Sequence, residues 1–237
     1  MIILALDALD HDTVKKYKCR NLMQIEYGKT DLSSFQLERT VVLWASFLTG
    51  KNMEKKIPIK TQWEFKLQYK ETFLPSFKTY KLIDFPSFSL KEENHEKERM
   101  ILKKYFNNEA TEEEYDSIIW ENHHENKKDF FDSIERFDNL LGYFDLADAI
   151  GHISFGLPQK MKTVYRELEE IAKEVKKCTD EFTLILSDHG MKQVGRYGDH
   201  SRNGFYSLNQ KIGLTSPKIT DFYNIIKKAA QNESSKH

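Results

Sequence analysis

The sequence predicts an α/β protein built on a mostly parallel sheet with helices on both faces. Residues 2–6 are continuously apolar and residues 182–187 are mostly apolar, which is typical of parallel strands that are buried on both sides. A third strand-like segment over residues 140–145 precedes an amphipathic helical pattern over residues 159–178, which leads into segment 182–187. This order of strand, helix and strand favours a parallel sheet that is covered by helices.

The first half of the chain begins with the strand over residues 2–6, which Asp7 ends. Residues 13–18 and 21–25 are expected to form short helices. Residues 41–48 make a second apolar run, and the Gly50 that follows it is a turn or helix-end signal.

Residues 51–130 differ in character from the rest of the chain, because they are rich in Lys, Glu and aromatic residues and contain three of the five prolines. We predict that they form an insertion or cap within one large domain, residues 1–237. Thr111 and Glu114 match a capping box, so the second half of the segment should be helical. The aromatic residues between 63 and 88 are expected to pack a cap core rather than to stack on a base or sugar.

The second half of the chain returns to the core pattern. We expect a loop from residue 146 to Pro158, ahead of the helix over 159–178. Three further features complete the chain: a strand over 205–208, a closing helix over 221–230 and a disordered tail over 232–237.

The composition excludes several classes of protein. Apolar residues are 39% of the chain, and 36 basic residues stand against 37 acidic ones, which excludes a disordered acidic tail and gives no basic excess for general nucleic-acid binding. No run approaches the roughly 18 apolar residues of a membrane span. Cys19 and Cys178 are too few for a disulfide scaffold, so a reducing, cytoplasmic location is expected.

Acidic and imidazole side chains occur where the predicted strands end, and ligands of open α/β sheets bind in the crevice beyond those strand ends. A single such Asp is usually a turn former, so only the joint occurrence indicates a site. Carboxylate oxygen and imidazole nitrogen together suit zinc, manganese or a similar divalent ion. The residues are Asp7 after strand 2–6, Asp188 and His189 after strand 182–187, Asp148 and His152 in the expected loop, and His200 in the polar loop 198–202.

Several segments match motifs of a known family, and the most specific of them is Ser187-Asp-His-Gly-Met191. The others are the opening strand that ends in Asp7, the pair Asn21-Leu22, residues 40–50 with Thr40, Trp44 and a Thr-Gly pair, Asp148-Ala-Ile-Gly-His152, and Ile219-Thr-Asp221. On these motifs the chain resembles the alkaline phosphatase superfamily, and most closely its type I phosphodiesterase/nucleotide pyrophosphatase branch. The resemblance implies an alkaline phosphatase-like core and leaves out about residues 51–130.

The resemblance also implies a catalytic site with two divalent ions, for which zinc is expected and manganese is the alternative. Each ion would have three protein ligands and an open position, as catalytic sites require. By this resemblance, Asp7, Asp188 and His189 would hold one ion together with the Thr40 oxygen, and Asp148, His152 and His200 would hold the other.

The implied activity is hydrolysis of phosphodiester or pyrophosphate bonds through a phospho-threonine intermediate at Thr40. The partner would be a small phosphorylated substrate, with a nucleotide as the candidate. One alternative is a phosphomonoesterase or phosphomutase of the same superfamily. Another is a non-catalytic, metal-stabilised binding protein, which has no reason to keep all seven site residues. Cys19 precedes Arg20 without the C-x-P-S-R pattern of a formylglycine sulfatase, which argues against that branch.

Other polar residues are weaker candidates. Arg39, Lys51 and Arg202 are near site positions in the sequence and could contact phosphate, although basic residues are more often solvated. His95 has no partner in view, and His123 is expected at the surface of a charged helix.

Overall fold

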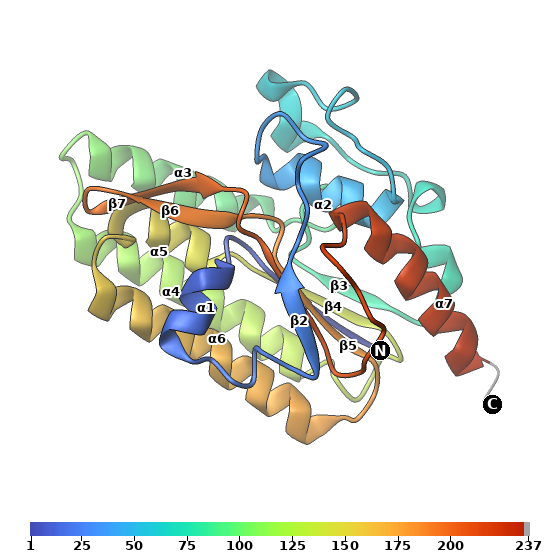
Figure 1. The fold of residues 1–237 in the computed structure, drawn as a ribbon. Helices are drawn as coiled ribbons and strands as arrows, with labels where there is room; N and C mark the ends of the chain where they lie inside the picture. The colour runs from blue at the N-terminus through green and yellow to red at the C-terminus, as the bar shows by residue number, and fades with distance from the viewer. Residues whose placement is uncertain (235–237) are drawn as a thin grey trace.

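The computed structural model describes residues 1–234, and its centre is a six-stranded sheet in the order β2-β8-β5-β1-β4-β3 (Figure 1). Strands β5, β1, β4 and β3 pair in parallel, whereas β8 is antiparallel to both of its neighbours. The predicted mostly parallel α/β fold is therefore confirmed. The strands of this sheet are β1 (Ile2–Leu6), β2 (Glu26–Lys29), β3 (Lys81–Ile83), β4 (Leu140–Phe144), β5 (Thr183–Leu186) and β8 (Phe205–Leu208).

Helices cover both faces of the sheet because the central strands are apolar on both sides. In β1, Ile3 and Ala5 pack into one hydrophobic core, while Ile2, Leu4 and Leu6 pack into the other. The first core contains α2 (Thr40–Thr49) and α7 (Phe222–Ser234). The second core contains α1 (His11–Tyr17), α3 (Glu92–Phe106), α4 (Glu112–Phe131), α5 (Leu146–Ser154) and α6 (Pro158–Cys178).

Two kinds of smaller element complete the fold. A separate hairpin of β6 (Gly190–Val194) and β7 (Tyr197–Ser201) follows β5 and lies beside α5 (Figure 1). The 3-10 helices are Ile59–Glu64, Tyr69–Glu71, Leu74–Ser76 and Ile219–Asp221. Among residues 1–234, none of the helices combines the length and apolar character that crossing a bilayer requires.

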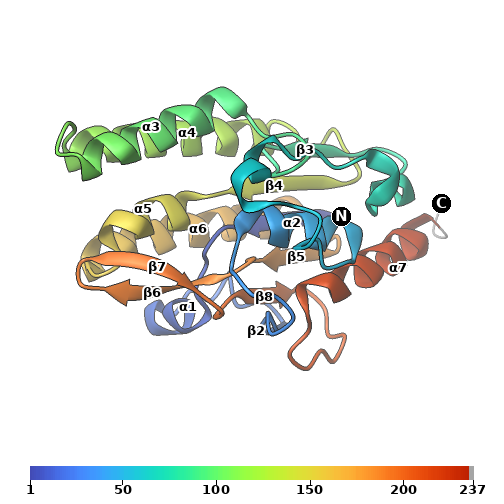
Figure 2. The same cartoon turned by 90° about the horizontal axis from the view of Figure 1, so that it is seen from above.

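Residues 51–130 contribute to the sheet as well as to its cover. Strand β3 pairs in parallel with β4 and forms one edge of the sheet, while α3 and α4 lie side by side along the same flank (Figure 2). Phe73 and Phe85 are fully buried against α2, so part of the aromatic set packs as expected. Trp63 is 42% exposed. That the whole segment is an insertion stays a prediction.

Two local predictions are wrong. Residues 21–25 form turns instead of a helix, because the Glu169 carboxylate accepts hydrogen bonds from the backbone N–H groups of Asn21 and Leu22. The expected loop after β4 is instead α5, since Leu146, Ile150 and Ile153 have helical spacing and are fully buried.

The ends of the chain also differ from expectation. Helix α7 continues to Ser234, so residues 232–234 of the expected disordered tail are helical, and residues 235–237 lie outside the described part of the chain.

The predicted capping box of Thr111 and Glu114 is confirmed at the start of α4.

Candidate metal centre

One group of predicted ligands gathers at the carboxyl ends of β1 and β5. These strands are parallel neighbours, so Asp7 and Asp188, each just beyond its strand, lie close to each other. The Nε2 atom of His189 is 3.2 Å from an Asp7 oxygen and 3.5 Å from an Asp188 oxygen. It is also 3.5 Å from the hydroxyl of Thr40, the first residue of α2. All four side chains are buried.

The second group of predicted ligands lies on α5 and β7, which are adjacent elements. Asp148 and His152 are not in a loop but one turn apart on α5, so both project from one face of the helix. His200 likewise lies on a strand, β7, rather than in a polar loop. The His152 and His200 Nε2 atoms are 3.3 and 3.2 Å from the Asp148 oxygens and 3.3 Å from each other.

The two groups form one continuous site. The ring of His200 stacks on that of His189, with 3.9 Å between centroids. Potential ligand atoms of Asp148, His189 and His200 lie within 4.8 Å of one another, as do those of the set made by Asp7, Asp188 and His189. His189 is thus within reach of both groups, and the structure brings all seven predicted residues together.

Hydrogen bonds orient two of the imidazole rings for metal binding. The Nδ1 atom of His189 is 3.0 Å from the Gly190 carbonyl oxygen, and that of His200 is 2.8 Å from the Glu38 carbonyl oxygen. A carbonyl only accepts, so each Nδ1 carries the hydrogen and donates it. The Nε2 lone pairs are then directed into the site, which is the arrangement of metal-binding histidines with an oriented outer partner.

Buried carboxylate oxygens at the site lack hydrogen-bond donors. Both oxygens of Asp188 and one oxygen of Asp7 make no hydrogen bond within residues 1–234, while the Tyr143 hydroxyl donates to the other Asp7 oxygen. Buried charges without partners are strongly unfavourable. The imidazole nitrogens and carboxylate oxygens of the site are separated by distances close to the roughly 3.3 Å between ligand atoms of tetrahedral zinc. Both the types of ligand atom and their separations therefore fit a divalent cation.

Burial and neighbouring charged groups together shift the pKa values of the site residues. Burial raises the pKa of Asp188 well above its usual range, and the charge of Asp7 adds to the effect. Burial would also raise the pKa of Asp148, but its interactions with His152 and His200 outweigh that effect and lower it well below the usual range. For His200, burial acts downward, yet the bond to Asp148 raises the pKa to about 9.

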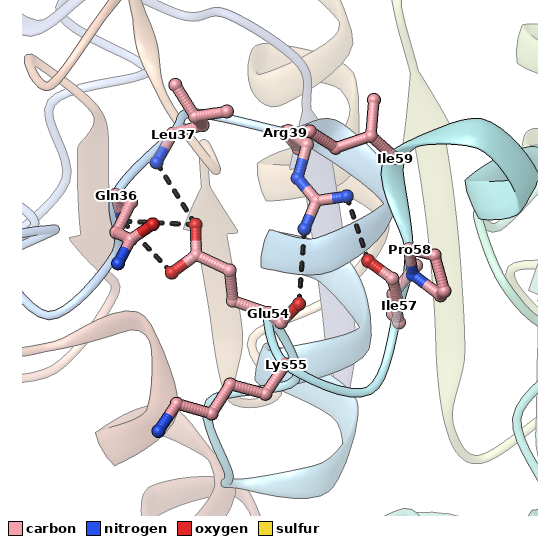
Figure 3. Close-up of a pocket in the computed structure, with 8 residues that line it drawn as sticks. All are labelled: Gln36, Leu37, Arg39, Glu54, Lys55, Ile57, Pro58 and Ile59. Carbon is pink, nitrogen blue, oxygen red and sulfur yellow. Dashed lines mark hydrogen bonds between the residues drawn. The ribbon is translucent and has the colours of Figure 1, made fainter.

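The three basic candidates for phosphate contacts are placed elsewhere or already engaged. Arg39 donates to the carbonyl oxygens of Glu54 and Ile57 (Figure 3), and Arg202 donates to the Glu38 carboxylate and to two neighbouring carbonyls. Lys51 follows α2, whose ten residues separate it from Thr40 by about 15 Å. The two arginines hold the segment that leads into α2.

Sequence reasoning missed a second polar cluster beside the site. The Nε2 atom of His95 is 3.0 Å from both Asp84 oxygens, and its Nδ1 atom is 3.0 Å from a Glu98 oxygen and 3.7 Å from an Asp145 oxygen. Although burial acts downward, the bonds to Asp84 and Glu98 raise the pKa of His95 to about 11. The expectation that His95 has no partner is wrong. The i,i+3 spacing of His95 and Glu98 was the only signal in the sequence.

His123 is also placed differently from the expectation. It is 2% exposed, and its Nε2 atom lies 3.2 Å from a Glu167 oxygen of α6. The charges around it in the sequence suggested a solvated helix, but α4 packs one face against the sheet and α5.

A pocket adjoins the candidate metal centre and extends to residues of segment 51–130. Four of the predicted site residues, Asp7, Thr40, Asp148 and His152, line it. Trp63 and the α3 residues His95, Glu98, Arg99 and Leu102 line it as well.

Comparison with known proteins gives matches among solved structures, whereas no protein-family model and no curated protein matches the chain. The chain is similar to murine ectonucleotide pyrophosphatase/phosphodiesterase 5 (TM-score 0.45, 12% identity), over 83% of this chain and 58% of that one, less than two thirds of its length. It is also similar to the PsFucS1 sulfatase from Pseudoalteromonas sp. (TM-score 0.48, 11% identity), over 97% and 67% of the two chains. Both are members of the alkaline phosphatase superfamily, which the motifs of this sequence resemble.

Proposed function

We propose that this protein is a hydrolase that depends on two divalent metal ions and cleaves phosphodiester or pyrophosphate bonds. The observation that carries the proposal is the position of the Thr40 hydroxyl, which is buried at the start of a helix and 3.5 Å from the His189 Nε2 atom within a cluster of six metal-type ligands. A threonine that only began a helix would not need three carboxylates and three imidazoles around it.

In this proposal Asp7, Asp188 and His189 hold one ion, and Asp148, His152 and His200 hold the other. Mixed imidazole and carboxylate ligands favour zinc, with manganese as the alternative. When bound, the ions supply positive charge that makes the threonine hydroxyl easier to deprotonate and offsets the charge of the phosphoryl oxygens.

Thr40 acts as the nucleophile of the proposed reaction. Its oxygen forms a bond to phosphorus while the bond from phosphorus to the leaving oxygen breaks, and water then hydrolyses the phospho-threonine ester. Helix α2 assists, because Arg39 at its N-cap makes no side-chain hydrogen bond to the first turn. The free N–H groups of that turn, at the positive end of the helix dipole, can therefore donate to a phosphoryl oxygen.

Tyr143 and Glu38 position ligands of the proposed site. The Tyr143 hydroxyl donates to Asp7 and turns the other Asp7 oxygen toward His189. The Glu38 carbonyl orients His200, and the Glu38 carboxylate binds Arg202. The segment before Thr40 is thereby tied to the hairpin that carries His200.

Two other functions differ from the proposed one, the first in its substrate and the second in its nucleophile. A phosphomonoesterase would use the same residues and would differ only in its substrate. A sulfatase with a formylglycine nucleophile lacks its cysteine here, because Cys19 is buried in a hydrophobic core and burial raises the pKa of its thiol to about 12. Both cysteines are free, and on this ground we keep the cytoplasm as the proposed location.

The test is hydrolysis of paired p-nitrophenyl monoester and diester substrates by purified protein loaded with zinc or manganese. Thr40→Ala should lower kcat by several orders of magnitude, whereas Thr40→Ser should keep substantial activity because the hydroxyl remains. The variants are compared at equal metal content and with equal circular dichroism spectra. Near wild-type turnover by Thr40→Ala would exclude the covalent mechanism. Turnover of neither ester, nor of ATP, with either metal would contradict the proposed function.

A further inference from the structure

One face of α3 lines the pocket beside the candidate metal centre and carries a cation. His95, Glu98, Arg99 and Leu102 occupy positions i, i+3, i+4 and i+7 of α3, so they lie on one helix face. Among residues 1–234, Arg99 is the only Lys or Arg residue that lines the pocket. Within residues 1–234, no carboxylate oxygen lies within 4.0 Å of its guanidinium nitrogens. The nearest interaction of this kind is with Glu92, which is bonded to Lys66 and whose pKa the charge of Arg99 helps to lower.

The Trp63 side chain holds this guanidinium group at the pocket. The Cζ atom of Arg99 lies 5.4 Å from the centroid of the Trp63 ring, which is the geometry of a cation–π contact. Stacking of this kind uses the face of the guanidinium group and leaves its N–H donors free to bind a ligand in the plane. The neighbouring Lys66 is not available in the same way, because it pairs with Glu92.

Among the described residues of α3 that line the pocket, no other cation has a free donor for an anion. Both ring nitrogens of His95 are already bonded, one to Asp84 and one to Glu98. Glu98 and Asp145 also line the pocket and would repel an anion. A substrate group that is negatively charged and lies outside the metal centre therefore has Arg99 as its donor.

We propose that Arg99, oriented by Trp63, binds a second anionic group of the substrate. This inference rests on the proposed function, and it narrows the substrate class. The phosphorus that reacts would sit at the metal centre, and a second phosphate would bind at Arg99. The preferred substrate would then be a pyrophosphate, such as a nucleoside diphosphate or triphosphate, rather than a diester whose other groups carry no charge.

The test compares two nucleotide substrates in wild type, Arg99→Gln and Lys97→Gln, all loaded with the same metal. ATP carries further phosphates beside the reacting one, whereas the p-nitrophenyl ester of thymidine 5′-monophosphate does not. Lys97 is the matched control, because it is an exposed cation on α3 that does not line the pocket. Loss of charge-assisted hydrogen bonds predicts that the ratio of kcat/KM for ATP to that for the ester falls about tenfold or more in Arg99→Gln. Lys97→Gln should keep the wild-type ratio.

A binding measurement keeps the test independent of turnover. Isothermal titration calorimetry gives the Kd of AMP and of its α,β-methylene diphosphate analogue. In the wild type the analogue should bind more tightly than AMP, and this difference in Kd should be lost in Arg99→Gln but kept in Lys97→Gln. Arg99→Lys should restore part of it if Arg99→Gln folds poorly. An unchanged ratio in both measurements would overturn the subsite. If the wild type hydrolyses neither substrate, the proposed function fails, and the Kd ratio still decides whether Arg99 binds the second anion.

Discussion

Removal of the divalent ions should lower the thermal stability of the protein by a predictable amount. A ligand that binds only the folded state at a free concentration of 100 times its Kd adds about 2.7 kcal/mol. For a domain of 150–250 residues, 1 kcal/mol shifts Tm by about 2–4 °C. Chelation of one such ion should therefore lower Tm by about 5–11 °C, and chelation of both by more.

The Asp188→Asn variant makes this prediction specific to the site. Asp188 is fully buried, and neither of its oxygens has a hydrogen-bond partner among the described residues. In chelated protein the substitution removes a buried charge and keeps the shape of the side chain, so the Tm of the variant should equal or exceed that of the wild type. In metal-loaded protein the variant should lose a ligand of one ion, and its Tm should fall below that of the wild type. The order of the two Tm values should thus reverse on metal addition.

The assay is differential scanning calorimetry with and without chelator, combined with elemental analysis of the dialysed protein. The wild type should retain close to two ions per chain and Asp188→Asn close to one. Asp180→Asn is the control, because Asp180 is exposed and lies before β5, at the opposite end of the strand from Asp188. A wild-type Tm that changes by no more than about a degree on chelation would refute the reasoning. A rise in Tm on metal addition that is equal in the wild type and in Asp188→Asn would refute it as well.

Three further variants address the pocket and its surroundings. Trp63→Ala should raise KM for nucleotide substrates more than it lowers kcat, because Trp63 is exposed and lines the pocket, and steady-state kinetics would check this. Phe65→Ala should instead lower Tm, because Phe65 packs against a hydrophobic core; loss of folding in both variants would favour a packed cap. The His95 pKa of about 11 against an ordinary 6.5 means that between these values the folded state holds a proton that the unfolded state lacks. The stabilisation from this proton is complete below pH 6.5 and is lost as the pH rises toward 11. The free energy of unfolding of the wild type, measured by urea denaturation, should therefore exceed that of His95→Gln by less at pH 10 than at pH 7. A difference that is as large at pH 10 as at pH 7 would contradict this.

The sequence alone determined the parts of this protein whose signals are local. Strand β1 is a continuous apolar run, β4 and β5 are mostly apolar, and α6 has a clear helical period, so their state depends little on distant residues. The ligand candidates could be found for the same reason, since Asp7, Asp188 and His189 directly follow such strands.

Elements that depend on distant partners could not be identified in this way. Strands β2 and β3 are short edge strands without a continuous apolar run, and each exists because a neighbour supplies its hydrogen bonds. The segment after β4, which was expected to be a loop, is the helix α5 because Ile150 and Ile153 pack into the core.

Tertiary structure also decided which charged residues are available to a ligand. Arg39 and Arg202 resemble phosphate-binding residues by position, but backbone carbonyls from other segments occupy their donors. Arg99 carried no signal in the sequence, and its place in the same pocket as Thr40 results from the packing of α3 beside α4. The physical reason is that the free energy of a charged side chain depends on which partners surround it in space, and those partners are tens of residues away along the chain.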